Sequence, residues 1–104
     1  MKYNPAEQEP VIEERQEQKV QKPKMYKVIM HNDDITTMDF VVQVLVDVFH
    51  KTVEDASTIM MKIHTTGQSV CGVYPREIAE FKIFRTLQLA REAHFPLLCT
   101  MEEE

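Results

Sequence analysis

Two short stretches of this sequence carry side chains that could bind a small polar ligand. The first is the run His-Asn-Asp-Asp at residues 31–34, and the second contains Met60, Ile63 and His64. Amide, carboxylate and imidazole groups accept hydrogen bonds from a cation, whereas methionine and isoleucine offer apolar walls. These residue types predict a site with a polar rim and an apolar lining. Simpler interpretations are a solvated turn at residues 31–34, a helix-end role for His64 and core filling by Met60.

A catalytic interpretation of the same residues is weaker. Asp33, Asp34 and His64 could act as an acid/base group or as metal ligands, since carboxylates and imidazoles do both. The sequence has only two glycines, no glycine-rich phosphate loop, no nucleophile motif and no histidine pair at zinc-ligand spacing. No catalytic residue, metal or cofactor is therefore expected. A third alternative, an interaction domain without a pocket, predicts that Met38→Ala and Asp33→Ala leave all partner binding intact.

The composition indicates a small globular protein. The chain has 104 residues, of which 43% are apolar and 28% charged, and this suits one hydrophobic core. Its near-apolar stretch from Phe40 to Phe49 contains polar residues and is too short to span a membrane. No signal or transit peptide is evident, so a cytoplasmic protein is expected. The net charge of -5 argues against nucleic-acid binding, which requires a basic face.

Charge and apolar content divide the chain near residue 24. Residues 1–24 contain five basic residues, five glutamates and three prolines among a few scattered apolar side chains. Such a segment cannot bury enough surface to offset an ordering entropy of about 1 to 2 kcal/mol per residue. We therefore expect a flexible N-terminal extension over residues 1–24 and a folded domain over residues 25–104. Cys71 and Cys99 are too few for a disulfide framework and are expected to be buried apolar residues.

The folded part begins with two elements that bracket residues 31–34. Alternating side chains predict a strand over residues 26–31, and the short polar side chains that follow end it. Thr36 and Asp39 have the spacing of a capping box, so a helix should begin there. The apolar face of this helix is predicted to contain Phe40, Val41, Val44, Leu45, Val48 and Phe49.

The second polar stretch belongs to another predicted helix. Thr52 and Asp55 repeat the capping-box spacing, and Gly67 is expected to end the helix. The inner face of this helix is predicted to contain Val53, Ala56, Ile59, Met60 and Ile63.

The rest of the chain predicts a strand over residues 68–74, a third helix and a final strand over residues 97–101. Pro75 suits the first turn of the third helix, where its missing amide hydrogen costs nothing. The order strand, helix, helix, strand, helix, strand predicts an α+β fold, with a three-stranded, mainly antiparallel sheet covered by three helices. The buried stripe of the third helix is predicted to contain Ile78, Ala79, Ile83, Leu87 and Ala90.

Several motifs in this order resemble one known family. The run Met-Tyr-Lys-Val-Ile-Met-His-Asn-Asp-Asp at residues 25–34 resembles the ClpS adaptors of bacterial Clp proteases. The resemblance continues to residue 101 without evident gaps, so it covers nearly the whole predicted domain. Its further motifs are Thr36, Met38, Phe40 and Val41; Met60-x-x-x-His64-x-x-Gly67; Cys-Gly-Val-Tyr at 71–74; Glu-Ile-Ala-Glu-x-Lys at 77–82; and Pro-Leu-Leu-Cys-Thr at 96–100.

The resemblance implies an adaptor that recognises N-degrons, that is, proteins whose first residue is Leu, Phe, Tyr or Trp. Asn32, Asp33 and His64 match the family's contacts to the free α-amino group. Met38 matches the methionine that restricts β-branched first residues. The family's hydrophobic specificity pocket matches Asp33, Asp34, Thr36, Met38, Val41, Met60, Ile63 and Leu97.

The resemblance also implies a protein partner. Family members deliver substrates to a ClpA or ClpC type of AAA+ unfoldase, and their docking residues match Glu77, Glu80 and Lys82. The N-terminal extension of the family assists delivery, which assigns a role to residues 1–24. We expect a monomer with no nucleic-acid or membrane partner.

Three positions depart from the family pattern. Thr37 stands where Pro is usual, and Pro75 stands where a capping Ser or Thr is common. Phe81 replaces a small polar residue, and Phe84 follows three positions later, at helical spacing. These two aromatic side chains could enlarge the docking surface or simply add packing.

Overall fold

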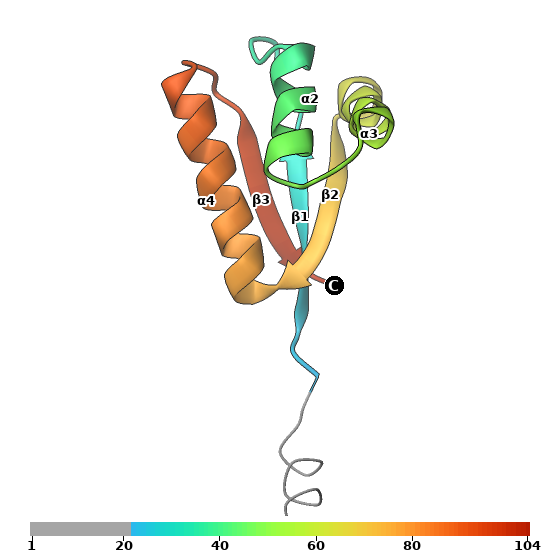
Figure 1. Cartoon of the computed structure of the whole chain (residues 1–104), viewed down its shortest axis with the longest axis vertical. Coiled ribbons are helices and arrows are strands. Elements are labelled where there is room, and N and C mark those ends of the chain that lie inside the picture. The colour runs from blue at the N-terminus through green and yellow to red at the C-terminus, as the bar shows by residue number, and fades with distance from the viewer. Residues whose placement is uncertain (1–21) are drawn as a thin grey trace, which may run out of the picture.

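The strands and helices follow one another in the predicted order in the computed structural model, which describes residues 22–104 (Figure 1). The three antiparallel strands and the three helices confirm the α+β fold class. The strands are β1 (Met25–His31), β2 (Gln68–Pro75) and β3 (Leu98–Glu103), and the helices are α2 (Met38–Asp47), α3 (Val53–Thr66) and α4 (Arg76–Glu92).

The sheet places β1 at its centre. The strand order is β2-β1-β3, and β1 is antiparallel to both neighbours. Met30 lies opposite Ser69 of β2 and Cys99 of β3, and the pairing of β1 with β2 shifts between Val28 and Ile29. Because β1 is central, the loop that follows its last residue begins in the middle of the sheet end and not at a free edge.

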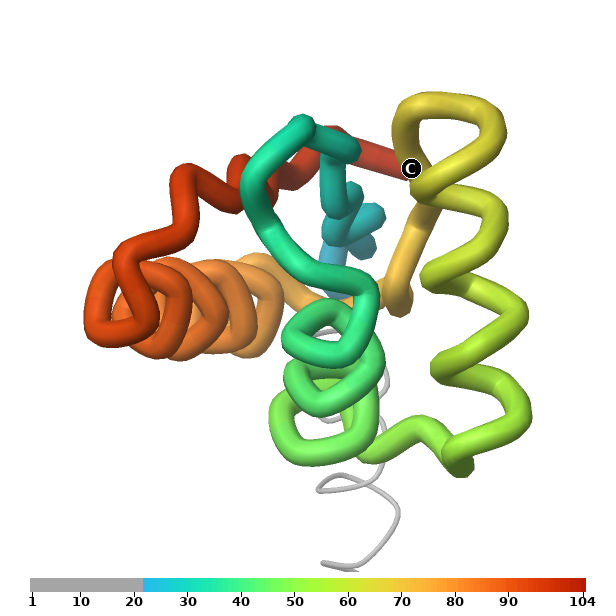
Figure 2. The backbone as a smooth tube through the Cα atoms, turned by 90° about the horizontal axis from the view of Figure 1, so that it is seen from above, coloured from blue at the N-terminus to red at the C-terminus, as the bar shows by residue number. Residues whose placement is uncertain are grey.

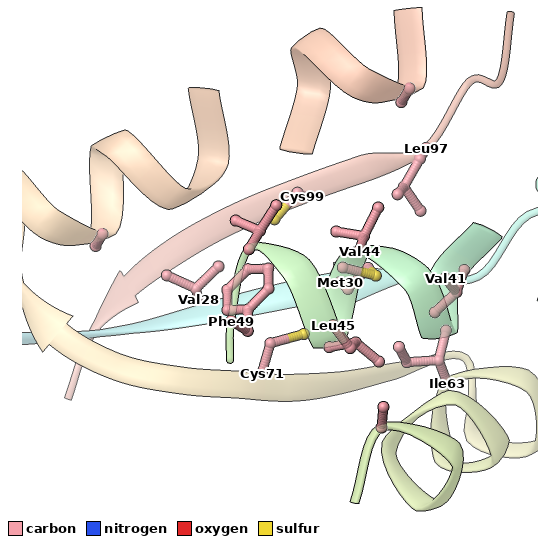
Figure 3. Close-up of a cluster of buried hydrophobic side chains, with 14 residues drawn as sticks. Val28, Met30, Val41, Val44, Leu45, Phe49, Ile63, Cys71, Leu97 and Cys99 are labelled. Carbon is pink, nitrogen blue, oxygen red and sulfur yellow. The ribbon is translucent and has the colours of Figure 1, made fainter. Parts of the chain in front are cut away.

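All three helices pack on one face of the sheet. Val28 and Met30 of β1, Cys71 of β2 and Cys99 of β3 point to this face and belong to the same hydrophobic cluster. Figure 3 shows these side chains packed around Leu45, Val44 and Phe49. α2 lies between α4 and α3 in both views of the backbone (Figures 1 and 2). Its position over the sheet explains why α2 has the widest apolar face of the three helices.

The apolar face of α2 is buried as predicted. Val41, Val44, Leu45, Val48 and Phe49 are all buried, and Phe40 is partly buried against Phe95. Full burial of each such side chain contributes about 1.5 to 3 kcal/mol, which outweighs the few tenths lost to β-branched residues in a helix.

Cys71 and Cys99 are free thiols in this core. Burial raises the pKa of each thiol to about 12, so neither carries a reactive thiolate near neutral pH. This agrees with their prediction as buried apolar residues.

The predicted start of α2 was wrong by one residue. Thr37 is the N-cap, and its side-chain oxygen accepts a hydrogen bond from the amide of Phe40 at 3.2 Å. The hydroxyl of Thr36 lies one residue earlier, in the loop, where it donates to Asp33 Oδ2. The loop therefore forms a turn, closed by hydrogen bonds between Asp33 and Thr36, before the helix begins.

The predicted limits of α3 are confirmed. The hydroxyl of Thr52 accepts a hydrogen bond from the amide of Asp55 at 3.1 Å. Gly67 ends the helix in the left-handed conformation, with φ of 99°, and its amide donates to the carbonyl of Ile63. Val53 was wrongly placed on the inner face, because the first residue of α3 points to solvent.

α4 differs more from its prediction. Its fully buried residues are Ala79, Thr86 and Ala90, and the predicted Ile83 and Leu87 are partly buried against the core, whereas Ile78 is 46% exposed. A turn of about 100° per residue places Ile78 beside the line of fully buried residues and not on it. Pro75 ends β2 and is the N-cap of α4, so it precedes the first turn. The last strand begins at Leu98, after Leu97, and extends to Glu103.

Most of the predicted extension, residues 1–21, lies outside the described residues, so its flexibility stays a prediction. Residues 22–24 are exposed and precede β1. Among the helices of residues 22–104, none has the length and apolar character needed to cross a membrane.

Candidate functional site

A cavity of about 400 Å³ lies where β1 ends, between the start of α2 and the last turns of α3. This volume is in the range of about 300 to 1000 Å³ that small-ligand pockets occupy. The cavity is lined by Asn32, Asp33, Asp34, Ile35, Thr36 and Thr37 of the loop, by Met38 and Val41 of α2, and by Met60, Ile63 and His64 of α3. Two stretches that are distant in sequence, residues 32–34 and 60–64, therefore meet at one site. His31 does not line the cavity, and its Nε2 is hydrogen-bonded to the hydroxyl of Thr100 at 2.8 Å.

The loop wall is organised by the carboxylate of Asp33. Asp33 Oδ1 accepts hydrogen bonds from the amides of Ile35 (2.9 Å) and Thr36 (2.7 Å). Asp33 Oδ2 accepts a further bond from the hydroxyl of Thr36 at 2.7 Å. Partial burial by itself would raise the pKa of Asp33, but these three hydrogen bonds outweigh it and lower the pKa below its usual value. Asp33 is thus a fixed negative charge at the cavity wall.

The two halves of the site are joined by a backbone hydrogen bond. The amide of Asn32 donates to the carbonyl of Gly67 at 2.8 Å, which ties the end of β1 to the end of α3. His64 lies in the last turn of α3 and is exposed at the cavity. The partial negative charge of this helix end adds to the carboxylates of Asp33 and Asp34. The site therefore favours a cationic group.

The apolar wall continues the hydrophobic core. Val41 and Ile63 are buried members of the core cluster that also line the cavity, and Figure 3 shows them near one another where α2 faces α3. Met38 is the first residue of α2 and is 42% exposed, so it does not fill the core. Met60 is partly buried against the core cluster. These four side chains give the cavity an apolar interior beside its polar loop.

The residues that the sequence suggested for the site gather here with one exception. Leu97 is 5% exposed within the core and is not among the cavity's lining residues. It directly precedes β3 and belongs to the hydrophobic core. Ile35 and Thr37 line the cavity although sequence reasoning did not select them. Their positions within the loop between two predicted lining residues were the available signal.

The described residues were also compared with the requirements of a metal site. Among residues 22–104, no three His, Cys, Asp or Glu side chains are arranged to hold a metal ion.

The predicted docking residues lie on α4, away from this cavity. Glu77 and Glu80 are exposed, and Glu80 pairs with Arg76 at 2.9 Å. Lys82 turns inward: its Nζ donates to the carbonyl of Val48 at the C-cap of α2, at 2.6 Å. Its ammonium also lies 5.6 Å from the ring centroid of Tyr74. Lys82 therefore holds α4 against α2, a role that the sequence did not indicate.

Phe81 and Phe84 are the most exposed aromatic side chains of the folded part. They are 62% and 65% exposed, so they add little packing within the domain. Together with Ile78 they form an apolar stripe on the outer face of α4, which we call the α4 stripe. Phe81 also borders a second, smaller cavity of about 260 Å³ between α4 and the end of α2.

Comparison with known proteins identifies the family. Residues 21–100 match the family model described as ATP-dependent Clp protease adaptor protein ClpS. The ATP-dependent Clp protease adapter protein ClpS of Lawsonia intracellularis is 52% identical over 101 residues, which cover 97% of this chain and 93% of the relative. The protein of the same name from Desulforapulum autotrophicum is 53% identical over 100 residues, covering 92% of this chain and 96% of the relative.

The fold agrees with a solved structure as well. The structure of Agrobacterium tumefaciens ClpS2 bound to L-phenylalaninamide matches with a TM-score of 0.77 and 42% sequence identity. The match covers 80% of this chain and 100% of that chain. The resemblance inferred from the motifs is confirmed, and the catalytic alternative is set aside because the relatives are named as adaptors. The chain belongs to the ClpS family of ATP-dependent Clp protease adaptors and is an adaptor protein, not an enzyme.

Proposed function

We propose that this chain is an N-degron adaptor that binds the first residue of a substrate in the cavity at the end of β1. The observation that carries the proposal is the combination of a negatively charged rim and an apolar interior within one cavity of about 400 Å³. L-phenylalaninamide, the ligand of the solved relative, has a matching pair of groups: a free α-amino group and an apolar side chain.

The α-amino group of the substrate would bind at the polar rim. An α-ammonium is a compact cation that donates hydrogen bonds, and its pKa is about 7.7 to 8.0. Asn32, Asp33 and His64 supply an amide oxygen, a carboxylate and an imidazole around the same cavity. An internal peptide bond carries no such charge, so this rim would select chain ends.

The first side chain of the substrate would occupy the apolar interior. Met38, Val41, Met60 and Ile63 can surround a Leu or aromatic side chain, and its burial contributes about 1.5 to 3 kcal/mol. Alanine or glycine would bury much less area and bind more weakly. Met38 would disfavour Ile and Val, because branching at Cβ widens the side chain close to the rim.

We further propose that α4 carries the docking surface for a Clp unfoldase of the ClpA or ClpC type. Glu77 and Glu80 would provide charged contacts, and Lys82 would act mainly by holding α4 in place. The α4 stripe would extend this surface with exposed apolar area, a feature that is typical of protein interaction sites. Residues 1–24 would assist delivery as a tether, in a cytoplasmic, monomeric adaptor.

The proposal is tested by titration with a set of peptides that differ only in their first residue. We expect micromolar or tighter dissociation constants for peptides that begin with Leu, Phe, Tyr or Trp, and much weaker binding for Ala, Ile and Val. The matched control is the Phe-initiated peptide with an acetylated α-amino group, which removes the cation and should lose most of the affinity. Equal binding of the free and acetylated peptides would reject the assignment of the cavity.

A further inference from the structure

Asp33 uses most of its hydrogen-bonding capacity inside the protein. An ionised carboxylate has about four acceptor positions, two on each oxygen. Both positions of Oδ1 are occupied by the amides of Ile35 and Thr36, and one position of Oδ2 is occupied by the Thr36 hydroxyl. Within the described residues, one acceptor position of Oδ2 remains.

Thr36 makes two of these three bonds, one through its amide and one through its hydroxyl. The hydroxyl has a single proton, which it donates to Asp33 Oδ2 at 2.7 Å. Thr36 lines the cavity beside Asp33 and is half-buried. A carboxylate without this bond could rotate about its terminal torsion, since that torsion is broad for Asp. The hydroxyl therefore fixes the plane of the carboxylate at the cavity wall.

We propose that Thr36 is a positioning residue for the substrate's amino group: its hydroxyl and amide orient the Asp33 carboxylate so that one acceptor position of Oδ2 faces the incoming ammonium. This inference rests on the proposed N-degron function. A carboxylate held in this way loses no side-chain freedom when the substrate binds, so its charge-assisted hydrogen bond is made at low entropic cost. Thr36 thereby contributes to affinity through Asp33 even where it only borders the substrate's side chain.

The inference is tested with Thr36→Val, which keeps the shape of the side chain and removes the donor. Affinity for the Phe-initiated peptide is expected to fall about tenfold, as is typical when a hydrogen bond to a charged group is lost. Thr36→Ser restores the donor and should recover the affinity to within about twofold, allowing for the lost methyl contact. Thr58→Val is the matched control, since Thr58 is an exposed α3 residue whose hydroxyl donates to the carbonyl of Glu54.

The pH profile gives a readout that a loss of shape alone would not change. Because the three bonds lower the pKa of Asp33, its charge in the unmodified chain persists below the usual value of 3.8. Removing the Thr36 donor raises that pKa, so the acid limb of peptide binding should move to higher pH in Thr36→Val and not in Thr36→Ser. Asp34 and His64 also line the cavity, but they are present in all variants. The difference between the two profiles therefore reports on Asp33.

Hydrogen exchange of the unmodified chain is an independent measurement that does not depend on how the variants fold. The amides of Ile35 and Thr36 should exchange slowly with and without peptide, because the turn is already formed before binding. Faster exchange on binding would show that Asp33 releases the turn, and it would overturn the inference.

The outcomes distinguish a failure of the proposed N-degron function from a failure of the positioning role of Thr36. If the unmodified chain does not distinguish the free from the acetylated peptide, the proposed function fails and the inference fails with it. If it does distinguish them, but Thr36→Val retains full affinity and an unshifted acid limb, the positioning role alone is rejected.

Discussion

The cavity at the end of β1 and the outer face of α4 use similar side chains in opposite ways. In the cavity, carboxylates and apolar side chains line a hollow in the surface. Two of the apolar lining residues, Val41 and Ile63, also belong to the hydrophobic core. On α4, the acidic side chains and the apolar α4 stripe lie on the exposed surface of a helix. Binding in the cavity is therefore coupled to the stability of the domain, whereas contacts on α4 can change without affecting the core.

The difference follows from how the helices pack. α2 and α3 contact the core through large side chains such as Leu45 and Ile63. The cavity lies between the start of α2 and the last turns of α3. α4 lies against the sheet through Ala79, Thr86 and Ala90, whose small side chains allow close approach. Its large side chains are divided: Ile83, Leu87 and Leu89 pack partly buried against the core, whereas Ile78, Phe81 and Phe84 are exposed. The ion pair Arg76–Glu80 on this face is exposed and screened by solvent, so it adds little to stability.

The largest expected effect comes from Ile63→Ala, which tests the coupling between cavity and core. Truncating this buried side chain should lower the free energy of unfolding by about 2 to 5 kcal/mol and also weaken binding of the Phe-initiated peptide. Chemical denaturation and peptide titration measure the two effects. Ile63→Val, which should cost only about 0.5 to 1.5 kcal/mol, allows the affinity to be measured if the alanine variant unfolds. A loss of stability without any loss of affinity would show that the cavity and the core are independent.

A smaller effect is expected for the double variant Phe81→Ser and Phe84→Ser, which removes the aromatic part of the α4 stripe. Affinity for the isolated N-terminal domain of the unfoldase should fall about tenfold, since two exposed aromatic contacts are lost at an interface. Peptide affinity and the free energy of unfolding should remain unchanged, because both side chains lie outside the core.

Lys82→Met is the matched control for this α4 experiment. It breaks the hydrogen bond to the carbonyl of Val48, so it should reduce stability as well as docking. If the double variant also destabilised the domain, the aromatic side chains would be acting within the fold and not as a separate surface.

The smallest effect concerns the inner side of α4. Thr86 is fully buried, and among the described residues its hydroxyl has no hydrogen-bond partner. Thr86→Val replaces the hydroxyl with a methyl group of similar size and should raise the free energy of unfolding by about 1 kcal/mol. Thermal unfolding measures this gain, with Thr58→Val as an exposed comparison. A destabilised Thr86→Val would show that the hydroxyl is needed in this packing.

The sequence predicted the fold well where local signals agree with burial. The spacing of Val44, Leu45 and Val48 indicated the buried face of α2, and Thr52 and Gly67 marked both ends of α3. The prediction of the start of α2 failed because two neighbouring side chains could both have capped the helix. Thr36 and Thr37 are neighbours with identical capping potential, and only the turn made by Asp33 decides that Thr37 caps the helix.

The sequence predicted most of the residues that form the site, but it predicted less well how their side chains are oriented. The motif resemblance selected nine residues that line the cavity, yet it also selected Leu97, which is buried in the core. The inward turn of Lys82 was not visible in the sequence, because its acceptor is the backbone carbonyl of Val48. Backbone acceptors carry no sequence signature, since every residue has one.

The sequence by itself determined the element order, the α+β class, the two polar stretches and the family, because these depend on residue types at local spacing. Only the tertiary structure decided that residues 32–34 and 60–64 face one cavity, that the Asp33 carboxylate accepts three hydrogen bonds from its own loop, and that Lys82 turns inward to the carbonyl of Val48. These features depend on long-range packing, in which the same side chain can lie inward or outward according to what its neighbours leave free.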